Sequence, residues 1–152
     1  MWTMAVAALL SAIHLLTLVL GAAAIFARGR ALSRPLDEAG WARLFQADNA
    51  WGIAALLWMA TGLGRVFYGG KEPSFYWRNG FFWTKLALFG VVFLLELTPM
   101  MTFIRVRRAR SEGTALPRFS IERYRRINNV ELALVLMIVF VAAFMARGAW
   151  LF

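Results

Sequence analysis

Four long blocks of apolar residues that carry almost no charge constrain the fold of this chain more than any other feature. Roughly 20 consecutive apolar residues suffice for a helix to cross the hydrocarbon core of a bilayer. The blocks cover about residues 2–27, 47–66, 81–104 and 129–150. Because a backbone inside lipid must satisfy its own hydrogen bonds, each block is expected to be helical. The pattern predicts an all-α bundle of four transmembrane helices, with residues 1–152 forming a single integral membrane domain.

The first block has an alternative interpretation as a cleaved signal peptide, since Ala22 and Ala24 resemble a cleavage site. However, no Lys or Arg precedes the apolar stretch, and the stretch is longer than the apolar region of such peptides. We therefore expect the first block to be a transmembrane helix.

A short helix is expected to lie at the membrane interface over about residues 35–47, just before the second span. Pro35 suits a first helical position, and Asp37 and Glu38 complement the helix dipole in the first turn. Trp41 and Leu44 follow at helical spacing, so they should bury one face while the acidic residues stay wetter.

The loops differ in basic charge, which predicts how the chain is oriented. The first and third loops carry twelve Lys and Arg residues, whereas the opposite side carries five. Loops rich in Lys and Arg stay in the cytoplasm. The odd loops are therefore expected to be cytoplasmic and both termini to lie outside. The same reasoning assigns the net charge of +9 to topology, so no nucleic-acid partner is expected.

Composition excludes several kinds of chemistry. The chain has no cysteine, so disulfides, thiolate metal sites and thiol catalysis are ruled out. Its single histidine rules out a multi-histidine metal site within one chain. No nucleophile–base pair or phosphate-binding loop is evident, and no catalytic residue is assigned.

A polar site near the middle of the membrane is predicted from His14, Glu96 and Met137. With a rise of about 1.5 Å per residue, these residues fall at similar depths below the outer ends of their helices. An ionisable group inside a bilayer is costly and calls for a functional reason. We expect His14 and Glu96 to point into the bundle and approach each other, forming a proton site. Two alternatives remain open, namely a haem b held by His14 and Met137, and polar contacts that simply join helices.

A second site is predicted in the outer loop, where four cations lie among aromatic residues. The cations are Arg65, Lys71, Arg78 and Lys85. Such a cluster suits the head group of an anionic lipid or another small anionic ligand. The alternative is an interfacial anchor, in which aromatic rings and long cationic side chains reach the head-group region.

Two stretches of the chain resemble a family of predicted bacterial membrane proteins, "domain of unknown function 2214". The stretches are GRVFYGGKEPSFYWRNGFFWTKLALF and TPMMTFIRVRR, and Asp48 and the region Leu10–His14 also fit. The resemblance implies a multi-pass protein of the bacterial inner membrane and no particular activity. A weaker likeness of fold links the chain to four-helix membrane proteins of the HemJ and CopD types, whose first helix also carries a histidine.

Two classes of function remain open from the sequence. The first is a non-enzymatic component of the inner membrane without a cofactor, such as a small transporter, a lipid-binding protein or an assembly factor. The second is a membrane redox protein that binds haem or porphyrin. The expected partners are the lipid bilayer and an anionic lipid or ligand, and self-association into a homo-oligomer is left open.

Overall fold

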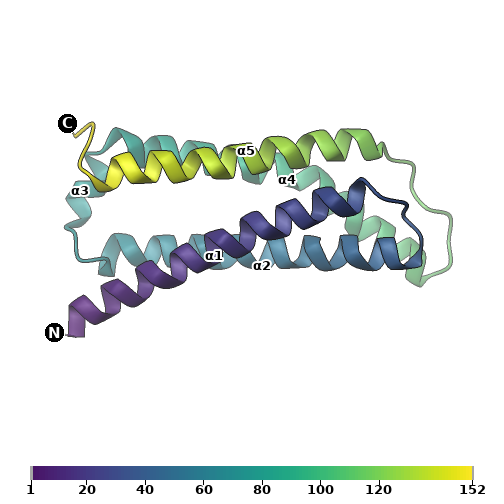
Figure 1. The fold of residues 1–152 in the computed structure, drawn as a ribbon, viewed down its shortest axis with the longest axis horizontal. Coiled ribbons are helices and arrows are strands. Elements are labelled where there is room, and N and C mark those ends of the chain that lie inside the picture. The colour runs from purple at the N-terminus through teal and green to yellow at the C-terminus, as the bar shows by residue number, and fades with distance from the viewer. Residues whose placement is uncertain (1, 152) are drawn as a thin grey trace.

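The computed structural model describes residues 2–151, which form an elongated bundle of helices (Figure 1). Within these residues the elements are α1 (Trp2–Leu32), α2 (Glu38–Tyr68), α3 (Pro73–Trp77), α4 (Gly80–Ser111) and α5 (Ile121–Ala146). The two chain ends and α3 lie at one end of the bundle, which we call the terminal end (Figure 1). The α1–α2 and α4–α5 connections lie at the other, which we call the arginine-rich end (Figure 1).

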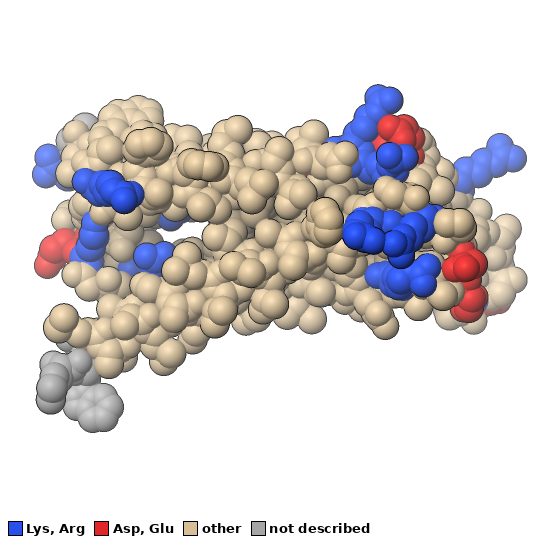
Figure 2. Space-filling view, viewed as in Figure 1, with Lys and Arg blue, Asp and Glu red and all other residues tan. Residues whose placement is uncertain are grey.

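Helices α1, α2, α4 and α5 are each long and apolar enough to cross a membrane. A helix of 31 residues, such as α2, is roughly 46 Å long, which exceeds the hydrocarbon thickness of about 30 Å. The ends of the helices therefore reach the head-group regions. On the face that Figure 2 shows, charged side chains gather toward the two ends of the molecule and leave a broad waist without them. The structure thus confirms the predicted all-α bundle of four membrane-spanning helices.

The helices extend further toward the arginine-rich end than the apolar blocks predicted. The expected interfacial helix is not separate, because α2 runs without a break from Glu38 into the span. It begins after Asp37, whose carboxylate accepts a hydrogen bond from the Gly40 N–H at 2.7 Å and so caps the helix. Trp41 and Leu44 are buried as expected, but against the other helices of the bundle. Helix α5 likewise begins at Ile121, two turns before the predicted span.

Two antiparallel pairs, α1–α2 and α4–α5, build the bundle, and their core differs along its length. At the arginine-rich end and in the middle, buried residues come from all four long helices. At the terminal end the core cluster contains Val66, Tyr76, Phe82 and Met145, and among the described residues none of its buried members comes from α1. Helix α1 crosses the bundle at a slant, so its first half diverges from α5 (Figure 1).

The chain returns against the start of α4 after α5 ends. Asn79 is fully buried, caps α4 by accepting from the Phe81 N–H at 3.0 Å, and donates to the Ala149 carbonyl at 3.1 Å. A Cβ atom on Gly80 would lie 2.3 Å from the Trp150 ring, so only glycine allows this close packing. The end of the described chain is thereby tied to the α3–α4 junction.

Candidate functional site

Arg28 is the most deeply buried charged side chain of the first helix, with 1% of its surface exposed. Its Nη1 donates to Asp48 Oδ1 at 3.2 Å and to Glu96 Oε1 at 2.8 Å. Its Nη2 donates to Glu131 Oε2, and its Nε donates to Asn128 Oδ1 at 2.9 Å. One guanidinium from α1 thus binds carboxylates from α2, α4 and α5. A buried charge requires such partners, since burial without them costs several kcal/mol.

Further contacts surround the same carboxylates. Trp51 Nε1 donates to Glu96 Oε2 at 3.1 Å. Arg107 Nη2 donates to Asp48 Oδ2 at 2.8 Å, and its Nη1 donates to Asn49 Oδ1 at 2.6 Å. We call Arg28, Asp48, Glu96, Arg107 and Glu131 the ionic cluster. Because it links α1 and α2 to α4 and α5, it joins the two helix pairs in the half of the bundle nearer the arginine-rich end.

Sequence reasoning missed Arg28, which it counted as a loop residue that sets topology. A signal for it was present, because His14, Gly21 and Arg28 are spaced by seven and therefore share one face of α1. In the structure this face meets α2. A Cβ on Gly21 would lie 3.0 Å from the Trp51 ring, so the small residue lets the two helices approach closely. Arg28 reaches Asp48 on the same face.

His14 lies between α1 and α2, nearer the terminal end than the ionic cluster. Trp58 Nε1 donates to His14 Nε2 at 3.0 Å, so this ring nitrogen carries no proton. Thr61 Oγ1 lies 2.9 Å from His14 Nδ1 and 2.7 Å from the Leu57 carbonyl, to which it donates. The Thr61 oxygen therefore accepts from Nδ1, and His14 is a neutral imidazole. It acts as a polar contact between two helices.

The predicted contact between His14 and Glu96 is wrong. His14 bonds Trp58 and Thr61, whereas Glu96 bonds Arg28 and Trp51. Trp51 and Trp58 are seven residues apart on α2, which separates the two groups by roughly 10 Å along that helix. Counting residues placed them at one depth because it treated α1 as upright, whereas α1 crosses the bundle at a slant (Figure 1).

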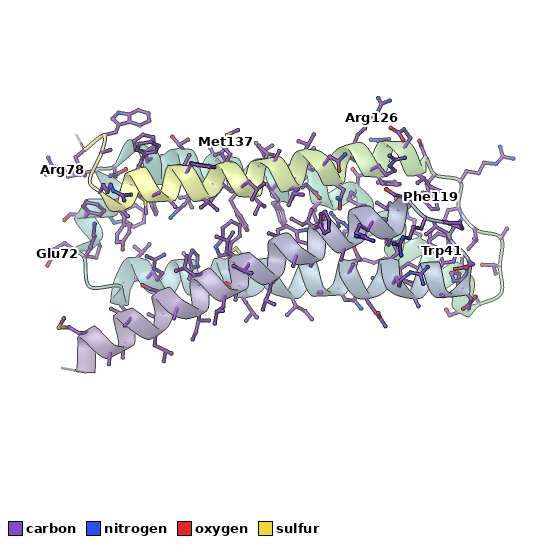
Figure 3. All side chains as sticks on the ribbon, viewed as in Figure 1. Trp41, Glu72, Arg78, Phe119, Arg126 and Met137 are labelled. Atoms are coloured by element: carbon purple, nitrogen blue, oxygen red, sulfur yellow. The ribbon has the colours of Figure 1, made fainter. Side chains whose placement is uncertain are left out.

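Met137, the third residue of the predicted mid-membrane site, is 49% exposed. It points away from α1 on the outer face of α5 (Figure 3). The structure therefore does not bring together His14 and Met137, the two haem ligands proposed from the sequence.

A cavity of about 280 Å³ lies between the helix pairs toward the terminal end. Its lining is largely apolar and includes His14, Trp58, Phe82, Lys85, Phe89 and Ile138. Figure 2 shows the surface hollowed between the two pairs in this half, with Lys or Arg side chains at the back of the hollow. Among the described residues, His14 is the only one from α1 in this lining, and the first half of α1 diverges from α5 (Figure 1).

The four cations predicted for the outer anionic site separate into two sets. Lys85 lines the cavity, with Nζ 3.9 Å from Met145 Sδ and 5.2 Å from the centre of the Phe82 ring. Arg65 interacts electrostatically with Lys85 and His14, and its Nε is buried without a hydrogen-bond partner. Neither Lys85 nor Arg65 forms a salt bridge with a carboxylate in residues 2–151. This pair is therefore unbalanced positive charge beside an apolar cavity.

The other two cations, Lys71 and Arg78, are exposed at the terminal end. Lys71 Nζ donates to the Ala146 carbonyl at 3.0 Å and lies 3.8 Å from the centre of the Phe75 ring. Arg78 projects at the end of the bundle, near the turn into α4 (Figure 3). These exposed positions fit the alternative in which the cations anchor the protein at the membrane interface.

The Tyr76 hydroxyl group donates to the Arg65 carbonyl at 3.2 Å, and burial raises the pKa of the Tyr76 phenol.

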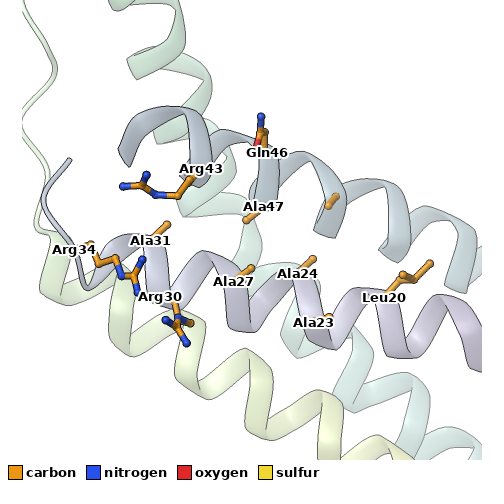
Figure 4. A pocket seen from close by; sticks show the side chains of 11 residues that line it. Leu20, Ala23, Ala24, Ala27, Arg30, Ala31, Arg34, Arg43, Gln46 and Ala47 are labelled. Carbon is orange, nitrogen blue, oxygen red and sulfur yellow. The ribbon is translucent and has the colours of Figure 1, made fainter. Parts of the chain in front are cut away.

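A second groove, of about 550 Å³, lies between α1 and α2 at the arginine-rich end. Alanines form its floor, and Arg30, Arg34 and Arg43 surround its mouth (Figure 4). Among the described residues, no buried polar atom that lacks a partner belongs to its lining. The groove is therefore explained by its alanines, small residues of the kind that lets two helices pack closely, and no ligand is needed to account for it.

The fold and its enclosed charges define a class, namely a multi-pass α-helical membrane protein with an ionic cluster inside the bundle. The chain belongs to the family described as "Predicted membrane protein (DUF2214)", which matches residues 6–149. This match confirms the family that the sequence resembles. The comparisons with curated proteins and with solved structures gave no match.

Proposed function

We propose that this protein is a non-enzymatic membrane component that binds an amphiphile with a negatively charged head group. The apolar chain of the ligand lies in the cavity between the helix pairs, and its carboxylate or phosphate meets Lys85 and Arg65. The observation that carries the proposal is an apolar cavity whose lining includes Lys85, together with the buried and unpartnered Nε of Arg65 on the adjoining part of α2. Neither cation forms a salt bridge with a carboxylate in residues 2–151.

Physical chemistry favours a ligand of this type. Ligand sites are usually apolar cavities of about 300–1,000 Å³ with a few polar groups that orient the ligand. At about 280 Å³ the cavity has room for part of an acyl chain, and the remainder of the chain can stay in the bilayer. A head group bound at Lys85 also supplies acceptors for the unpartnered Arg65 Nε. Hydrogen bonds between a charged donor and a charged acceptor are stronger than those between neutral groups.

Binding can be measured by quenching of tryptophan fluorescence with dibromostearate, because Trp58 and Trp77 line the cavity. The purified protein would be placed in phosphatidylcholine nanodiscs and titrated with the acid or with its uncharged methyl ester. We expect saturable quenching by the acid and much weaker saturable quenching by the ester. Equal quenching by both would contradict the proposal. Brominated phosphatidylglycerol, compared with brominated phosphatidylcholine, tests whether a phospholipid head group is the preferred source of charge.

Substituting Lys85 by Met should weaken binding of dibromostearate roughly ten- to a hundredfold. The change keeps the length of the side chain and removes a charged hydrogen bond worth about 1.5–3 kcal/mol. The matched control is Lys71→Met at the same end of the bundle, where the lysine is exposed and outside the cavity. If the two variants bind the acid equally well, the site does not lie at Lys85.

The orientation of the chain also belongs to this proposal. We infer a bacterial inner membrane, with the arginine-rich end in the cytoplasm and both termini in the periplasm, so that the cavity opens toward the outer leaflet. The bias of Lys and Arg between the loops supports this direction. The two ends of the described chain lie at the same end of the bundle, which supports the inference (Figure 1).

Fluorescent reporters that mature only in the cytoplasm provide the test of orientation. A reporter inserted in the loop between Ser111 and Ile121 should fluoresce, and one fused after residue 152 should not. Alkaline phosphatase, which is active only in the periplasm, should give the reverse pattern at the same two positions. A fluorescent fusion at the end of the chain would overturn the assignment.

A further inference from the structure

The ionic cluster contains more negative than positive groups. Arg28 of α1 and Arg107 of α4 supply two positive charges, while Asp48 of α2, Glu96 of α4 and Glu131 of α5 supply three negative ones. Fully ionised, the cluster would hold one negative charge in excess inside the bundle. Burying an uncompensated charge is costly, and in practice such a group becomes neutral instead.

Glu131 provides a second, independent observation. The residue is fully buried, and its Oε2 accepts a hydrogen bond from Arg28 while its Oε1 has no partner. An ionised carboxylate only accepts hydrogen bonds, whereas a protonated one also donates. Glu96 and Glu131 bind the Nη1 and Nη2 atoms of the same Arg28 guanidinium, so the two carboxyl groups are neighbours. A proton held by this pair of carboxyl groups would balance the charge of the cluster.

We propose that the ionic cluster is a proton-binding site, in which Glu96 and Glu131 share one exchangeable proton at neutral pH. Asp48 stays ionised because both Arg28 and Arg107 bind it. With the proton bound, two guanidinium groups face two carboxylates and the cluster is neutral. This site differs in residues and position from the cavity, and it stands whether or not an amphiphile binds there.

Exchange of the proton takes place through Glu96. Glu131 has no exposed surface, whereas the side chains of Glu96 and Asp48 are 17% and 12% exposed. A proton leaving Glu131 passes to Glu96 and then to water. Its loss leaves a net negative charge where α1 and α2 meet α4 and α5, so deprotonation weakens the junction between the helix pairs.

Infrared spectroscopy of the purified protein tests the proposal directly, because a protonated carboxyl group has a distinct C=O stretching band. We expect this band at neutral pH in the wild type, with a shift in D₂O that shows exchange. Glu131→Gln and Glu96→Gln should each remove it, since the remaining carboxylate then balances the charge without a proton. The matched control Glu122→Gln, on an exposed residue of α5, should keep the band.

Thermal unfolding in detergent gives a second measurement with the same variants. The wild type should lose stability as pH rises from neutral to alkaline, whereas Glu131→Gln should lose much less, because glutamine mimics the protonated form. Glu122→Gln should behave as the wild type. The absence of the infrared band from the wild type, or its persistence in both Gln variants of the cluster, would overturn the proposal.

Discussion

Replacing Arg28 by Met should lower the free energy of unfolding by about 3–5 kcal/mol, because it removes the positive charge at the centre of the ionic cluster. The substitution leaves Glu131 fully buried and Glu96 largely buried without their guanidinium partner. Titration of the protein in mixed micelles with a denaturing detergent, followed by circular dichroism, would measure the loss.

Arg30→Met is the matched control for this experiment. Arg30 lies half a turn further along α1, is exposed, and forms no salt bridge in the part of the chain that the structure describes. We expect its substitution to change stability by no more than about 0.5 kcal/mol. Adding Glu131→Gln to Arg28→Met should restore part of the stability, since it removes one unpaired charge. Equal stability of the two Met variants would show that the buried position of Arg28 contributes nothing.

Replacing Phe103 by Ala should also destabilise the protein by about 3–5 kcal/mol, the usual cost of removing a large side chain from a packed core. Phe103 is completely buried and lies in the cluster that joins Trp41 and Leu44 of α2 to Tyr124 of α5. The loss of this ring leaves a cavity where the two helix pairs meet. The same detergent titration would measure the effect.

Phe93→Ala provides the control on the same helix. The Phe93 ring is 58% exposed on the apolar surface of α4, where lipid can replace it, so its removal should cost much less. A similar loss of stability in both variants would mean that burial between the helix pairs does not decide the effect. The two substitutions therefore separate packing inside the bundle from contact with lipid.

The bundle is held together unequally along its length. The ionic cluster and the core around Phe103 join the two helix pairs toward the arginine-rich end. Toward the terminal end, none of the described residues of α1 belongs to the buried core cluster, and a cavity lies between the pairs. This asymmetry places the proposed ligand site in the half with fewer contacts between pairs, where side chains can adjust to a ligand at lower cost.

The membrane class, the four spans and the family could be predicted from the sequence alone. A long apolar block in a bilayer is expected to form a helix, because only a helix satisfies all backbone hydrogen bonds within a single segment. Lys85 was also found from the sequence, as one of four cations among the aromatic residues of the outer loop. The structure places it on the cavity, while its role as a ligand site stays a prediction.

Only the tertiary structure decided which charges meet. Arg28 lies just beyond an apolar block, where sequence patterns indicate topology, yet α1 continues to Leu32 and carries it into the bundle. Glu131 lies near the start of the fourth apolar block, yet α5 begins ten residues before it and the side chain is fully buried. The sequence identifies the apolar segment that each long helix contains. The slant and rotation of each helix against its neighbours depend on packing across the whole bundle, and they decided that Glu96 meets Arg28 and not His14.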